Sequence, residues 1–574
     1  MLAGTETLAA IANDWLAKLE RALAEGDEAL LASLFLDDSH WRDLLALTWR
    51  ITTVSGKDGL TKELAFSAGK AKPRHFKVDP ERTPPRYAKR AGTSALEALF
   101  GFETGIGRCS GVLRLLPESE GGALKAWTFH TALDEIKGHE ERVGKLRPVG
   151  QSYSRDFGGP NWLDLRKADA EYAGRDPVVL VVGGGQAGLS IAARLRQMQV
   201  DTLIVDRWPR IGDNWRKRYH ALTLHNQVHV NHLPYLPFPP SFPVYIPKDK
   251  LAGWFEAYVE ALELNYWTGT EFEGGAYDEK EKRWTVALRR PDGTRRTLRP
   301  RHVVLATGVS GIPNLPDLPS LKNFSGKVLH SSQYVDGENW TGKKAVVVGT
   351  GNSGHDIAQD LHSSGASVTL LQRSPTLVVN IEPSAQLVYS LYSEGPPLED
   401  CDLITTSVPL ALAKRSHQLA TAHSKELDRP LLEALAKKGF RLDDGEDGTG
   451  WQFKYLTRGG GYYFNVGCSD LIVEGKIGFG PVSELEKHLE GADLVVLATG
   501  YKGQEHLVAK LFGAAVAERV GPIWGYGPGQ ELRNMFARTA QPGLWFIAGS
   551  FAQSRIYSRV LALQIKAAEL GLLQ

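Results

Sequence analysis

The chain contains few cysteines and few methionines, with only three of each among its 574 residues. The cysteines are Cys109, Cys401 and Cys468, and no two of them form a C-x-x-C pair. This pattern argues against a disulfide framework and against a zinc ribbon, and we expect no metal site. It also excludes enzymes that reduce disulfides through a redox-active pair of cysteines.

Long apolar runs and an excess of one charge are also missing. No apolar run reaches the roughly 18 residues that a membrane span requires. Acidic residues such as Glu6 and Asp14 interrupt the N-terminal segment where a signal peptide would stand. The net charge of +1 gives no reason to expect nucleic acid or an anionic membrane surface as a partner. We therefore predict a cytoplasmic protein of about three or four domains with a small-molecule partner.

One stretch, residues 177–206, has the form of a nucleotide-binding unit. A short apolar strand precedes the loop Gly183-Gly184-Gly185-Gln186-Ala187-Gly188, and a helical segment and a second strand follow it. Gly183 permits a tight turn, Gly185 permits close approach of a pyrophosphate, and Gly188 permits close packing of helix and strand. Asp206 ends the second strand at the spacing of about 20 residues at which a carboxylate binds the ribose hydroxyls.

A second unit of the same form begins at Lys344. Its loop is Gly349-Thr350-Gly351-Asn352-Ser353-Gly354, and Gln372 occupies the register that Asp206 holds in the first unit. No carboxylate stands there, and Arg373 and Ser374 follow. A carboxylate would repel a 2′-phosphate, whereas arginine and serine bind one. The second unit is therefore predicted to bind NADPH rather than NADH.

Two strand ends have the same sequence, Ala-Thr-Gly, at residues 306–308 and 498–500. A further strand ends at Gly549 before a C-terminal helix, which suits a last contact with the first nucleotide. The segment after Asp206 is rich in aromatic and amide groups, including Asn214 and Trp215, and could line an isoalloxazine ring. A covering loop with satisfied polar groups is an equal alternative for any single residue of that segment.

The first 150 residues carry no nucleotide motif. Amphipathic helical patterns come first, and strand-like segments are expected over residues 47–54, 96–104, 109–116 and 124–136. This order resembles the cone-shaped SnoaL-like domains of the nuclear-transport-factor-like superfamily, although no signature motif is present. The resemblance makes His40, Asp43 and His130 candidate pocket residues. A packing or dimerisation domain is the simpler interpretation, and it leaves a homodimer open.

The predicted fold class is α/β, with two Rossmann-like domains that bind FAD and NADPH behind a small α+β SnoaL-like domain. The expected domains are 1–150 for the SnoaL-like unit, 151–175 for a linker, 176–335 with 490–574 for FAD, and 336–489 for NADPH. The linker is expected to be irregular because its sequence is rich in glycine and charge without periodicity.

The segment between the two glycine loops narrows the family. Residues 324–334 contain Phe324, Gly326, His330 and Tyr334 at the spacing F-x-G-x-x-x-H-x-x-x-Y. This resembles the fingerprint of class B flavin-containing monooxygenases. The Baeyer–Villiger fingerprint differs, because it has Trp where this chain has Tyr334. Segments around Leu224 and Pro237 resemble the plant auxin-type YUCCA branch and related microbial enzymes.

The resemblance implies a flavoprotein monooxygenase in which NADPH reduces FAD. The reduced flavin would then hold a C4a-(hydro)peroxide that oxygenates a small organic substrate at nitrogen, sulfur or a carbonyl. A Baeyer–Villiger enzyme and an NADPH oxidase that releases H2O2 are the alternatives, and a degenerate flavoprotein with a working N-terminal module is a third. A polar residue near the flavin would support the oxygen adduct, and His225 or Asn226 is expected to fill that role.

Asn352 is the third catalytic candidate, since it resembles the family's residue at the junction of the cofactors. The predicted cofactor-binding residues come from both glycine units and the strand ends that follow them. They are Gly183, Gly185, Gln186, Ala187, Gly188, Asp206, Arg207, Asn214, Trp215, Leu224, His225, Thr307, Gly308, Gly349, Gly351, Asn352, Ser353, Gly354, Arg373, Ser374, Thr499, Gly500 and Gly549.

Overall fold

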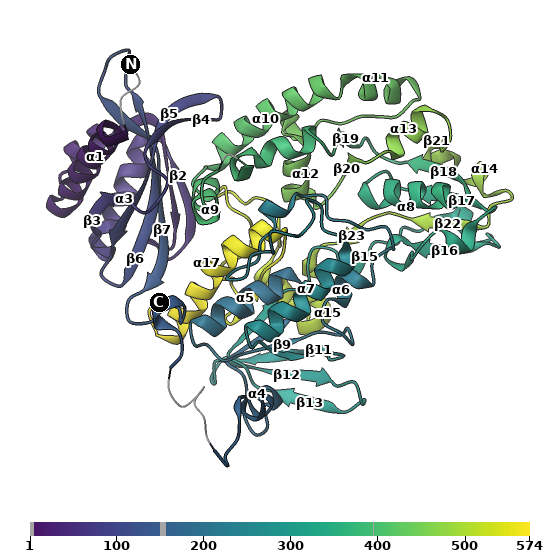
Figure 1. Cartoon of the computed structure of the whole chain (residues 1–574), viewed down its shortest axis with the longest axis horizontal. Helices are drawn as coiled ribbons and strands as arrows, with labels where there is room; N and C mark the ends of the chain where they lie inside the picture. Colours follow the sequence, from purple (N-terminus) through teal and green to yellow (C-terminus); the bar gives the residue numbers. More distant parts are fainter. Residues whose placement is uncertain (1–4, 150–156, 394, 574) are drawn as a thin grey trace.

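The computed structural model describes residues 5–149, 157–393 and 395–573. It has a mixed α/β fold with two parallel, Rossmann-type sheets and a separate N-terminal sheet. The N-terminal domain stands at one side of the molecule, and the parallel sheets lie beyond the yellow C-terminal helix α17 (Phe551–Glu569) (Figure 1).

The N-terminal domain is a seven-stranded, largely antiparallel sheet with three helices. Its strand order is β2-β1-β7-β6-β5-β3, and β4 pairs with β5. The helices are α1 (Thr5–Glu25), α2 (Glu28–Ser33) and α3 (Lys57–Ala71). The strands are β1 (Phe35–Leu44), β2 (Ile51–Ser55), β3 (Arg74–Val78), β4 (Arg86–Arg90), β5 (Thr93–Glu103), β6 (Gly107–Pro117) and β7 (Leu124–Ile136).

The predicted helix at the N-terminus and the three later strands are confirmed. The strand expected over residues 47–54 is confirmed only in its second half, because residues 45–50 turn between β1 and β2, and β2 begins at Ile51. The sequence also gave no sign of α3, whose apolar pattern is weak since only Leu60, Leu64 and Ala68 are its buried apolar residues. Aromatic rings fill the domain's interior: Phe100 stacks on Phe129 with their ring centroids 5.5 Å apart.

The three polar candidates of this domain make separate contacts. Asp43 accepts the hydroxyl of Thr131 at 2.6 Å, and burial raises the pKa of its carboxyl to about 6. His40 Nδ1 lies 2.7 Å from Ser55 Oγ, and His130 Nδ1 lies 3.0 Å from the backbone oxygen of Arg42. Burial lowers the pKa of His130 to about 3. These contacts support the packing interpretation, since the three side chains are held by different partners.

The first parallel sheet has the order β10-β9-β8-β14-β24 and carries the first glycine loop. An antiparallel meander of β11, β12 and β13 is inserted before β14. The strands are β8 (Val179–Val182), β9 (Thr202–Val205), β10 (Asn265–Trp267), β11 (Glu271–Asp278), β12 (Arg283–Arg289), β13 (Arg295–Leu298), β14 (His302–Leu305) and β24 (Leu544–Phe546). The helices are α5 (Gln186–Gln197), α6 (Asp213–Arg216) and α7 (Lys248–Ala261).

The second parallel sheet has the order β16-β22-β17-β18-β21 and carries the second glycine loop. Helix α8 (Asn352–Ser363) follows that loop. The strands are β16 (Lys327–His330), β17 (Lys344–Val348), β18 (Ser367–Gln372), β21 (Gly478–Pro481) and β22 (Leu494–Leu497). This differs from the predicted boundaries, which assigned β16 and β22 to the FAD unit. Buried parallel strands are short apolar runs, so their sequence does not reveal which sheet they join.

The region predicted as a linker also differs from expectation. Helix α4 (Trp162–Glu171) begins with a capping box in which Asn161 and Asp164 exchange hydrogen bonds. Tyr172 follows the helix, is fully buried, and donates to Asp201 at 2.7 Å. The helix is therefore docked on the unit of the first glycine loop although its own sequence is polar, and residues 150–156 lie outside the described residues.

Residues 377–473 add a mostly helical layer to the second unit. A short parallel pair, β19 (Leu377–Asn380) and β20 (Tyr462–Asn465), lies beside α8. Around it lie α9 (Leu398–Thr406), α10 (Leu410–Leu427), α11 (Arg429–Lys437), α12 (Gly450–Arg458) and α13 (Cys468–Val473). Beyond β22 come α15 (Gln504–Phe512) and α16 (Ala514–Val520), and α14 (Leu485–Leu489) precedes β22.

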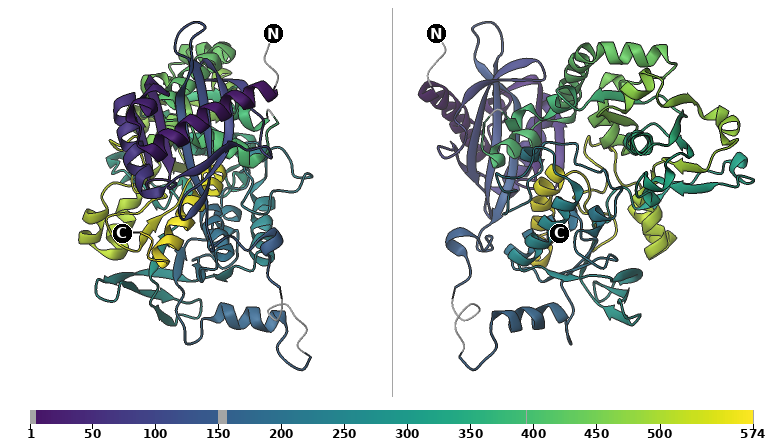
Figure 2. Two further views of the ribbon diagram at one scale, coloured as in Figure 1. Left: turned by 90° about the vertical axis from the view of Figure 1, so that its left-hand side faces the viewer. Right: turned by 45° about the vertical axis from the view of Figure 1, so that its right-hand side comes forward.

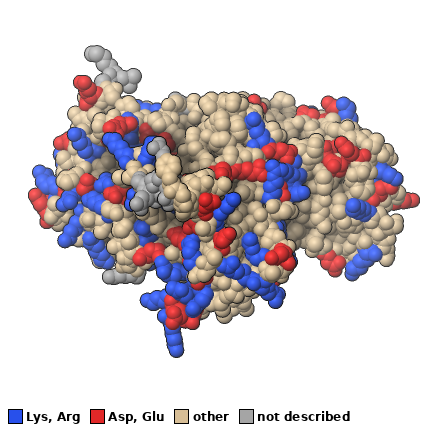
Figure 3. Space-filling view, turned by 60° about the horizontal axis from the view of Figure 1, so that its bottom comes forward, with Lys and Arg blue, Asp and Glu red and all other residues tan. Residues whose placement is uncertain are grey.

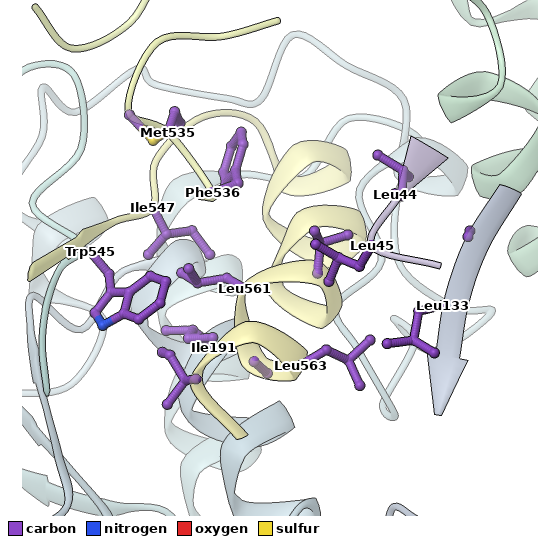
Figure 4. Close-up of a cluster of buried hydrophobic side chains, with 14 of the residues drawn as sticks. Leu44, Leu45, Leu133, Ile191, Met535, Phe536, Trp545, Ile547, Leu561 and Leu563 are labelled. Carbon is purple, nitrogen blue, oxygen red and sulfur yellow. The ribbon is translucent and has the colours of Figure 1, made fainter. Parts of the chain in front are cut away.

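The outward face of the N-terminal sheet packs on α17. Leu44, Leu45 and Leu133 lie toward Leu563 of this helix, and Leu561 and Ile191 continue the cluster into the unit of the first glycine loop (Figure 4). The turned views show the same sheet and helix side by side (Figure 2). The N-terminal domain therefore shares one continuous apolar core with the first nucleotide unit.

A buried arginine completes this interface. Arg42 Nε and Nη2 donate to the two carboxylate oxygens of Glu531 at 2.8 Å and 2.7 Å, and its guanidinium also reaches the backbone oxygen of Thr406. Arg114 donates to Ser407 at 2.8 Å, so the contact extends to the end of α9. Polar groups at this depth require such partners, which fixes the orientation of the domain.

The surface carries both signs of charge. Lysine and arginine alternate with aspartate and glutamate over the face in Figure 3, with a local excess of basic side chains at its lower edge. In the described part of the chain, every helix is too short or too polar to cross a bilayer.

Candidate functional site

The two glycine loops have the same local geometry. Gly183 and Gly349 have φ values of +105° and +112°, a region that favours glycine. A Cβ on either residue would lie within 2.6 Å of the backbone oxygen of the adjacent strand end, Ala306 or Ala498. The Ala-Thr-Gly segments therefore recur because each follows the strand that lies beside a glycine loop, β14 in the first sheet and β22 in the second.

Asp206 lies where the first unit requires a carboxylate. Its oxygens accept the backbone N–H groups of Gly184 at 2.7 Å and of Trp208 at 2.9 Å. Burial raises the pKa of its carboxyl above the ordinary value, although these two hydrogen bonds favour the charged form. The carboxylate is thus fixed beside the loop before any ribose binds.

A cavity of about 630 Å³ begins at this loop. Twelve of the predicted residues line it: Gly183, Gly185, Gln186, Ala187, Asp206, Arg207, Asn214, Trp215, Thr307, Gly308, Ser353 and Gly549. The other predicted residues lie outside its lining: Gly188, Leu224, His225, Asn226, Gly349, Gly351, Asn352, Gly354, Arg373, Ser374, Thr499 and Gly500. Ser353 belongs to the second glycine loop, so both units contribute to one cavity.

Features of this cavity fit a bound dinucleotide. A Cβ on Gly185 would come within 2.9 Å of Asn214 Nδ2, so this glycine keeps the loop open to a ligand. Helix α5 directs its free N-terminal N–H groups at the same space. Trp215 Nε1 and Thr307 Oγ1 are buried in the lining without a hydrogen-bond partner among the described residues. Buried polar atoms in this state are typical of a site that a ligand completes.

The fingerprint segment forms one wall of the cavity through Ser331, Ser332 and Tyr334. His330 Nδ1 accepts the backbone N–H of Ser332 at 3.1 Å, which leaves Nε2 to donate to the oxygen of Gly500 at 3.1 Å. The imidazole therefore ties this segment to the Ala-Thr-Gly end of β22. Burial lowers the pKa of His330, which favours the neutral ring that this pair of bonds requires.

Two tyrosines of the cavity wall bind helix α8. Tyr219 donates its hydroxyl to Asp356 at 2.5 Å, and Tyr334 donates to Asp360 at 2.7 Å. Asp356 and Asp360 are four residues apart and so share one face of the helix. Tyr334 belongs to the fingerprint, whereas Tyr219 is not among the predicted site residues. The two tyrosines join this cavity to the helix that follows the second glycine loop.

The three predicted catalytic residues gather around β20. The backbone N–H of Phe464 donates to Asn352 Oδ1 at 2.9 Å, and the Phe464 ring meets His225 edge-on at 5.3 Å. His225 Nε2 lies 3.9 Å from the Asp356 carboxylate, and burial lowers the pKa of the imidazole. Asn226 Nδ2 donates to the hydroxyl of Tyr389 at 3.2 Å. The structure thus places these residues in one neighbourhood beside α8, beyond the cavity lining.

Two arginines, Arg373 and Arg441, lie together at the end of β18, and the sequence predicted only Arg373. Gln372 is buried, and its amide exchanges two hydrogen bonds with the backbone of Arg441, at 2.9 Å and 3.0 Å. The Arg441 guanidinium donates to the backbone oxygen of Arg373, and both arginines are exposed together with Ser374. No local motif marks Arg441, since the chain brings it here from far along the sequence.

A family model described as pyridine nucleotide-disulphide oxidoreductase matches residues 180–391. The indole-3-pyruvate monooxygenase YUCCA1 of Oryza sativa subsp. japonica is 33% identical over 341 residues, which cover 57% of this chain and 77% of the relative. A probable indole-3-pyruvate monooxygenase, YUCCA10 of Arabidopsis thaliana, is 29% identical over 57% of this chain and 82% of its own length.

Two solved structures are similar at lower identity. The flavin-containing monooxygenase from Stenotrophomonas maltophilia is 18% identical with a TM-score of 0.43, covering 68% of this chain and 98% of that protein. The cyclohexanone monooxygenase from Rhodococcus sp. Phi1 bound to NADP+ is 16% identical with a TM-score of 0.48, covering 69% and 85%.

Proposed function

Because the chain belongs to the class B flavin-containing monooxygenases, enzymes that use FAD, NADPH and O2, we propose that it oxygenates a small organic substrate beside His225 and Asn226. One observation carries this proposal: both glycine units and the fingerprint segment border the same cavity, through Gly185, Ser353 and Tyr334. A hydride donor and a flavin held in two such units meet at one place.

The proposed roles of the protein's residues are binding, orientation and exclusion of water. Bound FAD would supply the redox and oxygen chemistry, and NADPH would supply the hydride. Gly185 and Asp206 would hold the first nucleotide, while Arg373, Ser374 and Arg441 would hold the 2′-phosphate of the second. Tyr219 and Tyr334 would keep helix α8 against the cavity through their aspartate partners.

The substrate class is proposed from the relatives and from the local rings. The two relatives above are named for indole-3-pyruvate, an aromatic 2-oxo acid. Tyr389, Trp451, Tyr462 and Phe464 form an aromatic cluster next to Asn226, which suits a planar substrate.

One experiment distinguishes three reactions: oxygenation at nitrogen, sulfur or a carbonyl, Baeyer–Villiger oxygenation, and release of H2O2 without substrate oxygenation. The compounds are an aromatic 2-oxo acid, a thioether, an amine and a cyclic ketone, and the NADPH consumed is compared with the H2O2 released for each. Equal H2O2 yield with every compound would favour the oxidase.

The N-terminal domain is proposed to be a SnoaL-like unit with a packing role. Helices α1 and α2 precede its sheet, α3 lies between β2 and β3, aromatic rings fill its interior, and its outer face is buried on α17. This use of the outer face within one chain favours packing over dimerisation. The cytoplasmic location stays a prediction.

Replacing Arg373 with alanine should raise the KM for NADPH by about 10- to 100-fold, because a charge-assisted hydrogen bond contributes about 1.5–3 kcal/mol. The KM for NADH should change little, since NADH has no 2′-phosphate. Arg441→Ala should act in the same direction, and the two changes together should abolish the preference for NADPH. Steady-state kinetics with both cofactors measures this, and Arg415→Ala, at an exposed arginine of α10, serves as the control. An unchanged preference in the double variant would refute the 2′-phosphate site.

His225→Leu and Asn226→Leu should each increase the H2O2 released per NADPH consumed, because a polar group beside the reaction site would be lost. In the unmodified enzyme, His225 has a lowered pKa and stays neutral above its ordinary value near 6.5. The H2O2 yield should therefore be constant above neutral pH and change only below it, as the imidazole gains a proton. A peroxide assay across pH measures this. His229→Leu, at a histidine of the same loop, is the control, and an identical yield in all variants would contradict the role.

A further inference from the structure

A second hollow, separate from the cofactor cavity, lies in the helical layer of the second unit. It measures about 260 Å³ and shares no lining residue with the larger cavity. It lies among β19, α10, α11 and α12 (Figure 1). Leu377, Leu432, Leu442 and Trp451 provide apolar walls, and Asp428 provides a carboxylate. Such a mixture of apolar walls and one polar anchor is typical of small-molecule sites.

Asp428 is a buried carboxyl group that forms no ion pair among the described residues. Asp428 is 3% exposed. Its oxygens accept hydrogen bonds from Asn380 Nδ2 at 2.8 Å, Asn380 N at 2.9 Å and Ser384 Oγ at 2.7 Å, and all three donors are neutral. Among the ion pairs of the described residues, none includes Asp428. Hydrogen bonds hold this carboxyl group in place, and it also stands at the N-cap of α11, where the helix dipole favours a negative charge, but no cationic side chain pairs with it.

The neighbouring carboxylates differ from Asp428 in this respect. Asp443 and Asp444 also line the hollow, but Asp443 pairs with Lys454 and Asp444 pairs with Lys425 at 2.8 Å. Lys425 is about half exposed, so its pair with Asp444 belongs to the rim. The unbalanced negative charge of the hollow therefore resides on Asp428, at its buried side.

Trp451 gives the hollow an aromatic wall. The residue is 8% exposed and lines the hollow. Its ring also meets Phe464 edge-on at 4.7 Å, and Phe464 in turn contacts His225. Tryptophan is the side chain whose ring face attracts cations most strongly. Asp428 and Trp451 together thus favour a cation over an anion.

We propose that this hollow binds a small organic ammonium compound with an apolar body. The ammonium group pairs with Asp428, and the apolar body lies against Leu432, Leu442 and the Trp451 ring. The proposal goes beyond the proposed oxygenation, because the hollow lies outside the cofactor cavity and is separated from His225 by the Trp451–Phe464 ring layer. It requires binding alone and no turnover.

Calorimetric titration of the FAD-loaded full chain without NADPH tests the proposal. The probes are phenethylammonium, the neutral 2-phenylethanol and the anionic 3-phenylpropionate, which share one ring and differ in charge. The ammonium probe should bind at least tenfold more tightly than the alcohol, and the carboxylate should bind most weakly. Asp428→Asn should reduce ammonium binding to the level of the alcohol. Glu433→Gln, which removes an exposed carboxylate outside the hollow, should change nothing.

If Asp428→Asn fails to fold, a second variant that fills the hollow with a larger side chain provides the test. Leu432→Trp should abolish binding of the ammonium probe while the flavin spectrum stays the same. Binding that persists in this variant would place the ammonium elsewhere and overturn the proposal, as would equal affinity for the ammonium and the alcohol. Failure of every substrate to be oxygenated would refute the proposed function and leave this result unaffected, because the titration involves no turnover.

Discussion

Gly188→Ala protein is expected to purify without bound flavin and to oxidise NADPH at least about 100-fold more slowly than the unmodified enzyme. A Cβ at this position would lie 1.9 Å from the backbone oxygen of Gly183 and 3.4 Å from the Cβ of Ala306. Backbone on the glycine loop cannot move aside as a flexible side chain can. Helix α5 must therefore shift away from β8, and the phosphate cradle at the helix N-terminus opens.

Flavin absorbance of the purified protein and its NADPH oxidation rate measure this effect. Gly253→Ala is the matched control, because Gly253 lies inside helix α7 with no atom within 4 Å of its added Cβ. That variant should keep its flavin and gain up to about 1 kcal/mol of stability. Gly354→Ala repeats the clash in the second unit, at 1.9 Å from the oxygen of Gly349. It should keep its flavin and lose reduction by NADPH. Full flavin content in Gly188→Ala would refute the assignment of the first loop.

Arg42→Met is expected to destabilise the protein by about 3–5 kcal/mol, because it leaves Glu531 as a buried charge without its partner. The Glu531 side chain is 17% exposed and also accepts the Thr53 hydroxyl at 2.7 Å. Its remaining contacts cannot replace a bidentate guanidinium. The first unfolding transition, followed by calorimetry, should fall in temperature, since this contact joins the N-terminal domain to the rest of the chain.

Arg42→Met combined with Glu531→Leu should recover most of the loss, because the buried charge is removed together with its partner. Lys18→Met is the control at an exposed ion pair, where Lys18 lies 2.6 Å from Asp14. Exposed pairs contribute about 0–1 kcal/mol, so this variant should unfold near the unmodified temperature. An Arg42→Met transition as high as that of the control would show that the interface is not held by this pair.

The parts of the fold that follow from local sequence rules were predictable. Each glycine loop has its positive φ angle, the close contact between its first and last glycine and the start of its helix fixed within about 20 residues of chain. The fingerprint also has a physical basis: a Cβ on Gly326 would lie 2.7 Å from the backbone oxygen of Asp493, and His330 binds Gly500. The spacing of the fingerprint residues could therefore be recognised locally, whereas their partners at Asp493 and Gly500 lie far along the chain.

Features that depend on distant parts of the chain could not be predicted. Arg441 reaches Arg373 only because the buried Gln372 amide holds its backbone, and that pairing leaves no pattern near either residue. The link from Tyr219 to Asp356 joins a loop of one unit to a helix of the other. Strands β16 and β22 were assigned to the wrong sheet because their apolar sequences suit both sheets equally.

The burial of the N-terminal sheet on α17 has a consequence for how the chain is made. Leu44, Leu45 and Leu133 precede α17 by more than 400 residues in the chain, so they leave the ribosome well before the helix that covers them. Until α17 has been made, the N-terminal domain therefore exposes an apolar face, and Arg42 lacks its partner Glu531 until that residue has been made. Uncovered surfaces of this kind promote aggregation, so this face of the nascent chain is exposed to that risk until α17 has been synthesised.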